Sequence, residues 1–294
     1  MSARIAATGV ALAFAACVGS AALPVSATTL AERDAALVAA AVAAMSPQRP
    51  GHPDLYVLGV AGDGEEDVFR NEVEYLQALA AARLDAGGRT LLLVNHADSL
   101  GASPRPLATL ATLRDALARI GAAMDREQDL LLLFLTMHGT SDHALVLKLW
   151  PLVEATITPD DLRDALADSG IRNRVVVVSA CFSGGFVPAL RADDALVVTA
   201  AHRARPSFGC GTASVATWFG RGWLIEGLNL GTSFIAAYDH ATGRIRGWEQ
   251  ARGFAPSLPQ IAVGSAIGAR LHAWESALPP AGPALPYPYP LPED

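Results

Sequence analysis

Two residues of this sequence have the type and the setting needed for nucleophilic chemistry: a histidine and a cysteine that each follow an apolar run. Residues 130–136 lead to His138 and Gly139. Residues 174–179, which are rich in valine, lead to Cys181. A cysteine attacks a carbonyl group as its thiolate, and a nearby imidazole can take the proton of the thiol. The backbone N–H groups of Gly139 and Cys181 can then stabilise the oxyanion that forms.

Each of these residues also has an ordinary structural explanation. A single cysteine at the end of an apolar strand is more often an inert core residue, and a single histidine in a loop is more often structural. The combination favours the catalytic interpretation, because two strand ends carry reactive side chains and each is followed closely by glycine. Glycine leaves room for a substrate to approach the backbone.

Strands and helices alternate along the chain, and this order decides where the two residues lie. The apolar runs that predict strands are residues 55–60, 90–95, 130–136, 174–179 and 195–199, with a small added strand at 145–150. The segments that predict helices are residues 29–45, 65–84, 106–124, the stretch opened by Thr158 and Pro159, and the glycine-rich 212–251. The alternation predicts a three-layer α/β/α sandwich with a mostly parallel sheet. Functional groups of such sheets lie beyond the carboxyl ends of the strands, so His138 and Cys181 meet if their strands are neighbours.

The composition excludes several classes of protein. The chain has 294 residues, of which 51% are apolar and 17% charged, so it can bury a large core and most of it is not disordered. A net charge of −7 without a basic run argues against a nucleic acid as partner. The three cysteines are too few for a disulfide scaffold, and no histidine spacing predicts a metal site. The sequence also lacks the motifs of nucleotide-binding enzymes and of serine hydrolases.

The N-terminus has the features of a secretory signal, which we expect over residues 1–27. Arg4 precedes an apolar run at residues 5–18, and small residues stand before Thr28 as a signal peptidase requires. We therefore expect an exported protein, periplasmic or extracellular. Three alternatives stay open: a buried N-terminal helix, a lipid on Cys17 that would tether the protein to a membrane, and a segment that stays uncleaved as an anchor.

These features divide the chain into four parts. The signal at 1–27 is followed by a helical or linker segment at 28–50, the α/β domain at 51–278 and a proline-rich tail at 279–294. The tail has many prolines and no periodicity, so we expect it to be extended or disordered. The sequence does not indicate an oligomeric state.

The segments around the two reactive residues resemble the catalytic boxes of a known enzyme family. Residues 133–139, with the sequence LFLTMHG, and 177–185, with the sequence VVSACFSGG, resemble those of legumain-like cysteine peptidases, and the bacterial branch is the most similar. Residues 59–64 and 207–210 extend the resemblance to a turn after the first strand and to a segment beside the substrate pocket. The resemblance implies a caspase-like sheet (the caspase–hemoglobinase fold), a peptide or protein substrate, and no metal or organic cofactor.

By the same resemblance, Cys181 is the nucleophile and His138 is the general base and acid. Gly139 and Cys181 supply the oxyanion N–H groups. The implied activity is that of a cysteine endopeptidase that forms an acyl-enzyme. Three alternatives stay open: a peptide ligase that uses the same dyad, a catalytically silent domain that binds peptides or partners, and an acyl hydrolase whose substrate is not a peptide.

The sequence departs from the legumain pattern around the substrate pocket. Asparagine-cleaving legumains have an acid two residues before the nucleophile, where this chain has Ser179. They have another after a Thr-aromatic-x-Gly segment, where this chain has Arg221. One hypothesis is that Arg221 favours an acidic or polar residue before the scissile bond, since guanidinium groups bind carboxylates. The alternative is that Arg221 is a solvated surface residue.

Three further residues belong to the predicted site. By resemblance, Ser207 lies in the segment beside the substrate pocket, and Asp63 is the nearest polar match to the family's third catalytic-site residue, an asparagine. Cys210 is either a small buried residue near the pocket or a redox partner of Cys181. The acidic residues at 63–67 favour a helix start over calcium binding, because carboxylates stabilise the positive end of a helix dipole.

Overall fold

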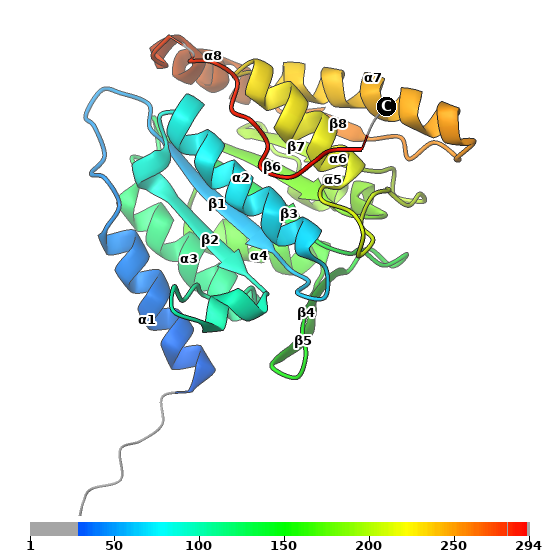
Figure 1. Ribbon diagram of the computed structural model, residues 1–294. Helices are drawn as coiled ribbons and strands as arrows, with labels where there is room; N and C mark the ends of the chain where they lie inside the picture. Colours follow the sequence, from blue (N-terminus) through cyan, green and yellow to red (C-terminus); the bar gives the residue numbers. More distant parts are fainter. Residues whose placement is uncertain (1–28, 281, 293–294) are drawn as a thin grey trace, which may run out of the picture.

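The computed structural model describes residues 29–280 and 282–292, which fold around a six-stranded sheet (Figure 1). Its strands, in spatial order, are β2 (Thr90–Val94), β1 (Leu55–Ala61), β3 (Leu130–Thr136), β6 (Arg174–Ser179), β7 (Ala195–Thr199) and β8 (Gln260–Val263). All neighbouring strands are parallel except β7 and β8, which are antiparallel. A separate antiparallel hairpin consists of β4 (Leu145–Leu149) and β5 (Val153–Ile157).

Helices cover both faces of the sheet, as Figure 1 shows. The helices that contribute to the core on one face are α2 (Asp67–Arg83), α6 (Trp218–Gly220), the π-helix η4 (Arg221–Leu228), α7 (Phe234–Arg252) and α8 (Ile267–Ala277). Those on the other face are α1 (Leu30–Ala43), α3 (Leu110–Ala123), α4 (Pro159–Ser169), the 3-10 helix η3 (Ser183–Phe186) and α5 (Val187–Leu190). Two short 3-10 helices, η1 (Gly87–Arg89) and η2 (Ala97–Leu100), flank β2. The predicted three-layer α/β/α sandwich with a mostly parallel sheet is therefore confirmed.

Burial on both faces explains why the strand segments are continuously apolar. Along β3, Leu132 and Phe134 belong to the core on the α2 side, while Leu131 and Leu133 belong to the core on the α3 side. A parallel strand covered by helices on both faces requires such a run. The strands predicted from apolar runs are accordingly found at the predicted positions.

The strands β5 and β8 and the helix α8 were not predicted from the sequence, and neither were the short helices η1, η2, η3 and α5. The β8 strand has only four residues and is only partly buried, and the centre of β5 is exposed and partly polar, so neither forms an apolar run. The glycine-rich segment 212–251 is helical only in part, because an irregular loop precedes α6 and a break separates η4 from α7.

Two glycines of η4 explain why this segment is rich in glycine. Gly222 and Gly227 face α7, where an added Cβ would lie 3.0 Å from the Ala241 Cα and 2.9 Å from the Ala237 Cα. The two helices therefore pack at backbone distance, which only a residue without a Cβ allows.

The C-terminal tail beyond α8 contains no helix or strand among its described residues, and it runs along α2 toward α6 (Figure 1). The Leu285 carbonyl accepts hydrogen bonds from the Tyr75 hydroxyl and the Asn229 amide, each at 2.8 Å. The Tyr287 hydroxyl donates to the Val215 carbonyl at 2.6 Å. The tail is thus extended, one of the two expected forms, and it connects α2 with the loop that precedes α6.

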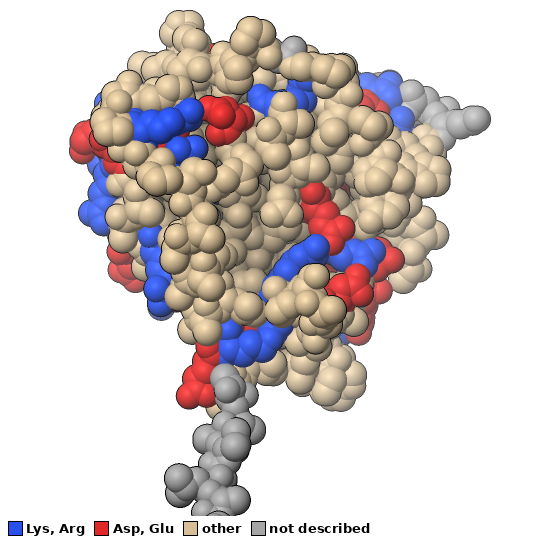
Figure 2. Space-filling model, turned by 60° about the vertical axis from the view of Figure 1, so that its left-hand side comes forward, with Lys and Arg blue, Asp and Glu red and all other residues tan. Residues whose placement is uncertain are grey.

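The predicted signal at residues 1–27, including Cys17, lies outside the described residues. Within the part of the chain that the structure describes, no helix is both long and apolar enough to cross a membrane. On the face shown in Figure 2, acidic and basic side chains lie in mixed groups around a broad uncharged area.

Candidate active site

The carboxyl ends of β3 and β6 bring the histidine and the cysteine to the same edge of the sheet. The two strands are direct neighbours, and Thr136 pairs with Ser179 at the end of their ladder. His138 and Cys181 each follow two residues later. The backbones are in contact here, because a Cβ added to Gly139 would overlap the Cys181 carbonyl oxygen. The condition for His138 and Cys181 to lie at one edge, that their strands are neighbours, is therefore met.

Two backbone N–H groups are available at this edge. Among the described residues, neither the Gly139 N–H nor the Cys181 N–H donates a hydrogen bond. Two other hydrogen bonds hold this loop: the Thr140 N–H donates to the Ala144 carbonyl, and the Val146 N–H donates to the His138 carbonyl. Neither of them involves the N–H of Gly139 or Cys181. Such N–H groups can donate hydrogen bonds to an oxyanion and stabilise its negative charge.

A carboxylate from the start of α2 accompanies His138. The Nε2 atom of His138 lies 2.8 Å from Glu66 Oε2, although the two are not aligned as a hydrogen bond. The imidazole also packs against the Phe69 ring in a T-shaped arrangement, with 5.2 Å between centroids and an angle of 83°. Glu66 directly precedes α2 and makes no side-chain cap bond to it. The Glu66 carboxylate therefore makes no hydrogen bond to the helix end and faces the imidazole.

The Cys181 thiol lies in surroundings that favour its thiolate. A hydrogen bond from the Cys210 thiol is the largest contribution that lowers the pKa of Cys181, to about 6, against the opposing effect of burial. The Ser207 N–H lies 3.3 Å from the Cys181 Sγ and the Ser207 hydroxyl 3.6 Å, and the charge of His138 adds a smaller effect. The same hydrogen bond and burial raise the pKa of Cys210. Both cysteines are free thiols in the structure, so Cys181 ionises first and Cys210 stays protonated.

Ser179 and a buried acid lie beneath this edge of the sheet. The Ser179 hydroxyl is buried and lies 3.3 Å from the Thr217 hydroxyl. Glu72 of α2 accepts hydrogen bonds from the Thr136 hydroxyl at 2.6 Å and from the Thr217 N–H at 2.7 Å. Complete burial raises the pKa of Glu72. Its carboxyl group thus ties α2 to β3 and to the loop before α6.

Two predicted site residues make their contacts elsewhere. Asp63 is buried, and its carboxylate accepts a hydrogen bond from the Glu65 N–H at 2.9 Å, which shapes the turn after β1. Arg221 donates to Glu226 at 2.8 Å and to the Pro292 carbonyl at 2.9 Å. Glu66, and not Asp63, is therefore the acid beside the imidazole.

The remaining predicted residues form one cluster: His138, Gly139, Cys181 and Ser207, with Ser179 below them. Across the described ranges, no group of three or more histidine, cysteine, aspartate or glutamate side chains is placed to hold a metal ion. Glu66 and Glu72 are absent from the prediction. One sequence signal points to Glu72, because it is an acid on the apolar face of the helix predicted at 65–84.

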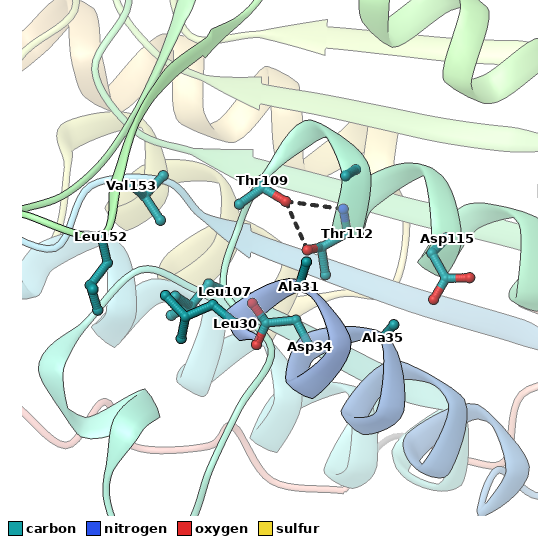
Figure 3. Close-up of a pocket in the computed structure, with 11 residues that line it drawn as sticks. Leu30, Ala31, Asp34, Ala35, Leu107, Thr109, Thr112, Asp115, Leu152 and Val153 are labelled. Carbon is teal, nitrogen blue, oxygen red and sulfur yellow. Dashed lines mark hydrogen bonds between the residues drawn. The ribbon is translucent and has the colours of Figure 1, made fainter. Parts of the chain in front are cut away.

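A cavity of about 280 Å³ lies apart from this cluster, between the first turns of α1 and α3 and the start of β5 (Figure 3). Its walls are largely apolar and include Leu30, Leu107 and Leu152, while Asp34 adds a carboxylate. None of its lining residues belongs to the cluster around His138 and Cys181.

Comparison with known proteins places the chain in a family. A search of curated proteins finds no match. Among solved structures, caspase-1 from Spodoptera frugiperda is similar with a TM-score of 0.48 and 13% identity, over 74% of this chain and 90% of that one. The model of the Peptidase C13 family matches residues 111–269, more than half of the chain, and this range contains both His138 and Cys181. The chain therefore belongs to the Peptidase C13 family, the legumain family of cysteine peptidases.

Proposed function

We propose that the chain is a cysteine endopeptidase in which Cys181 attacks the peptide carbonyl and His138 moves the proton. The observation that carries this proposal is a thiol of lowered pKa and an imidazole at the ends of two adjacent strands. Family membership implies a peptide or protein as the substrate.

The geometry supports the following sequence of steps. The thiolate of Cys181 adds to the carbonyl carbon, and the oxyanion that forms accepts hydrogen bonds from the N–H groups of Gly139 and Cys181. Protonated His138 gives its proton to the leaving amine as the C–N bond breaks, which leaves a thioester. His138 then takes a proton from water, the water oxygen attacks the thioester, and Cys181 leaves as the thiolate.

Glu66 orients His138 in this scheme and stabilises the imidazolium, because its carboxylate lies 2.8 Å from Nε2. We expect Glu66→Gln, which removes the charge and keeps the size, to lower kcat for peptide hydrolysis about tenfold to a hundredfold. KM should change little, since Glu66 contacts the imidazole. Steady-state kinetics on one fluorogenic peptide measures both constants.

The neighbouring Glu65 provides a matched control, because it pairs with Lys148 at the surface. Glu65→Gln should leave kcat within about twofold of wild type. In a His138→Ala background, Glu66→Gln should have no further effect, since the two residues act as one unit. An equal loss from Glu66→Gln in both backgrounds would show that Glu66 acts independently of the imidazole.

The proposed function is tested directly with a peptide that carries a thiol-reactive ketone. We expect the full chain to hydrolyse some members of a mixed peptide panel and to be labelled by the probe. Mass spectrometry should find the label on Cys181 and not on Cys210, because only Cys181 is ionised at neutral pH.

Other outcomes distinguish the alternatives. A folded chain that binds peptides but neither cleaves them nor reacts with the probe would be a silent binding domain. A chain that reacts with the probe and joins peptides when an amine is added, with little hydrolysis, would be a ligase. Either outcome would refute the endopeptidase proposal.

We also propose that the enzyme is exported. The basis is the sequence of residues 1–27, in which Arg4 precedes an apolar run and small residues precede Thr28. The mature protein would then begin at Thr28 and comprise the segment 28–50, the domain 51–278 and the tail.

A further inference from the structure

A small pocket lies beside the candidate active site, between the loop before α6, the end of α7 and the end of the C-terminal tail. Its volume is about 200 Å³. Two tryptophans, Trp218 and Trp248, and two arginines, Arg221 and Arg252, line it, and Pro292 of the tail closes one side. A cavity of this size with aromatic walls and cationic groups is suited to one anionic side chain.

The pocket is connected to the nucleophile by a short chain of contacts. Ser207, whose N–H lies 3.3 Å from the Cys181 Sγ, is followed by Phe208. The Phe208 ring packs against the Trp218 ring with 5.1 Å between centroids, and the Phe208 carbonyl accepts a hydrogen bond from the Trp218 N–H at 3.0 Å. A peptide held at Cys181 would therefore reach the pocket with a residue that flanks the scissile bond.

The charge of Arg221 is already balanced within the protein. Glu226 accepts hydrogen bonds from Arg221 at 2.8 Å and from Arg244 at 2.7 Å. Both guanidinium groups also lie over the Trp248 ring, at 4.5 and 4.9 Å from its centroid. Arg221 is thus held in place by Glu226 and Trp248 and serves the pocket mainly as a wall.

Arg252 is different, because no carboxylate of the described residues lies within ion-pair distance of it. Its guanidinium lies 5.2 Å from the centroid of the Trp218 ring and donates a hydrogen bond to the Trp248 carbonyl at 3.4 Å. Stacking on an aromatic face fixes the plane of a guanidinium and leaves its outer N–H groups available. Arg252 therefore brings to the pocket a positive charge that no carboxylate of residues 29–280 and 282–292 pairs with.

We propose that this pocket is a subsite for an acidic side chain of the peptide substrate, an aspartate or glutamate close to the scissile bond, with Arg252 as its cationic partner. The inference rests on the proposed peptidase function and adds a substrate class to it. It also reassigns the acidic preference, first considered for Arg221, to a residue that has no ion pair with another described residue.

The test compares peptides in which glutamate is moved through three positions on each side of the scissile bond, each matched with a glutamine peptide. At one position we expect wild type to prefer glutamate about five- to tenfold in kcat/KM, mainly through KM, as a charge-assisted hydrogen bond gives. Arg252→Gln should abolish this preference by lowering kcat/KM for the glutamate peptide toward that of the glutamine peptide. Arg246→Gln, on the same helix, should retain it.

A binding measurement separates this inference from the proposed function. Cys181→Ala should bind the preferred glutamate peptide more tightly than its glutamine partner, as measured by tryptophan fluorescence, and high salt should reduce the difference. Equal binding of the two peptides would overturn the subsite even if wild type cleaves both. Preferential binding without cleavage by wild type would support the subsite and refute the peptidase function.

Discussion

Replacing Cys181 with alanine lowers kcat/KM for peptide hydrolysis by about 10⁴-fold or more, because no acyl-enzyme can form. His138→Ala loses less, about 10²- to 10⁴-fold, which is the usual contribution of a general acid and base. The difference arises because the Cys210 thiol makes the largest contribution to the low pKa of Cys181, and His138 a smaller one. Cys181 should therefore remain a thiolate when the imidazole is removed, whereas the leaving amine loses its proton donor.

Two measurements on the same variants check this result. Hydrolysis of a fluorogenic peptide gives kcat/KM, and alkylation by iodoacetamide at pH 7 reports the thiolate alone. His138→Ala should be alkylated at close to the wild-type rate while it hydrolyses slowly. His272→Ala, at an exposed position of α8, should behave as wild type in both assays. Parallel losses of alkylation and hydrolysis in His138→Ala would show that the imidazole generates the thiolate.

Replacing Cys210 with alanine shifts the acid limb of the pH profile of peptide hydrolysis to higher pH. In wild type the pKa of Cys181 is lowered to about 6, so the thiolate predominates at all pH values above that. Without the thiol donor the pKa should rise toward the ordinary value of about 8.5. Activity at pH 6.5 should then fall about tenfold or more, whereas activity at pH 9 should approach that of wild type.

The pH dependence of Cys181 alkylation measures this shift directly. Cys210→Ser keeps a hydroxyl donor at the same position and should show a smaller shift than Cys210→Ala. An acid limb that stays near pH 6 in Cys210→Ala would assign the low pKa to the Ser207 contacts and His138 instead. Urea unfolding of both variants separates a titration effect from a loss of stability.

The reactive pair could be predicted because its position depends on local patterns. Continuous apolar runs at residues 130–136 and 174–179 identify strands that are buried on both faces. Parallel strands end at a common edge, so side chains that follow two neighbouring strands meet there. To place the two residues together, the strand order was needed in addition, and the structure shows that β3 and β6 are neighbours.

The two acids Glu66, just before α2, and Glu72, within it, could not be assigned their roles in the same way. Carboxylates at the start of a helix are common for electrostatic reasons, so the acidic residues at 63–67 indicate a helix start and nothing more. The turn after β1 decides that Glu66 faces His138 and that Asp63 does not. The role of Glu72 depends on contacts with two threonines that are far from it in sequence.

The missed elements lack a local signal for a related reason. Strand β8 is short and lies at the edge of the sheet, where it needs no apolar run. The tail is rich in proline, which has no backbone N–H and favours extended chain, and composition alone does not distinguish a bound segment from a free one. The position of the tail depends on specific hydrogen bonds, in which the Leu285 carbonyl accepts from Tyr75 and Asn229.

The course of the tail matters for anyone who handles this protein in the laboratory. A chain trimmed after α8 would leave the Tyr75 hydroxyl, the Asn229 amide and the Arg83 guanidinium without their tail partners, and it would remove the wall that Pro292 gives to the pocket. Pro292, whose carbonyl accepts a hydrogen bond from Arg221, lies beside the proposed subsite, so an affinity tag or reporter attached beyond it would be tethered close to that subsite. Altered specificity in such a fusion would then be an artefact of the attachment point.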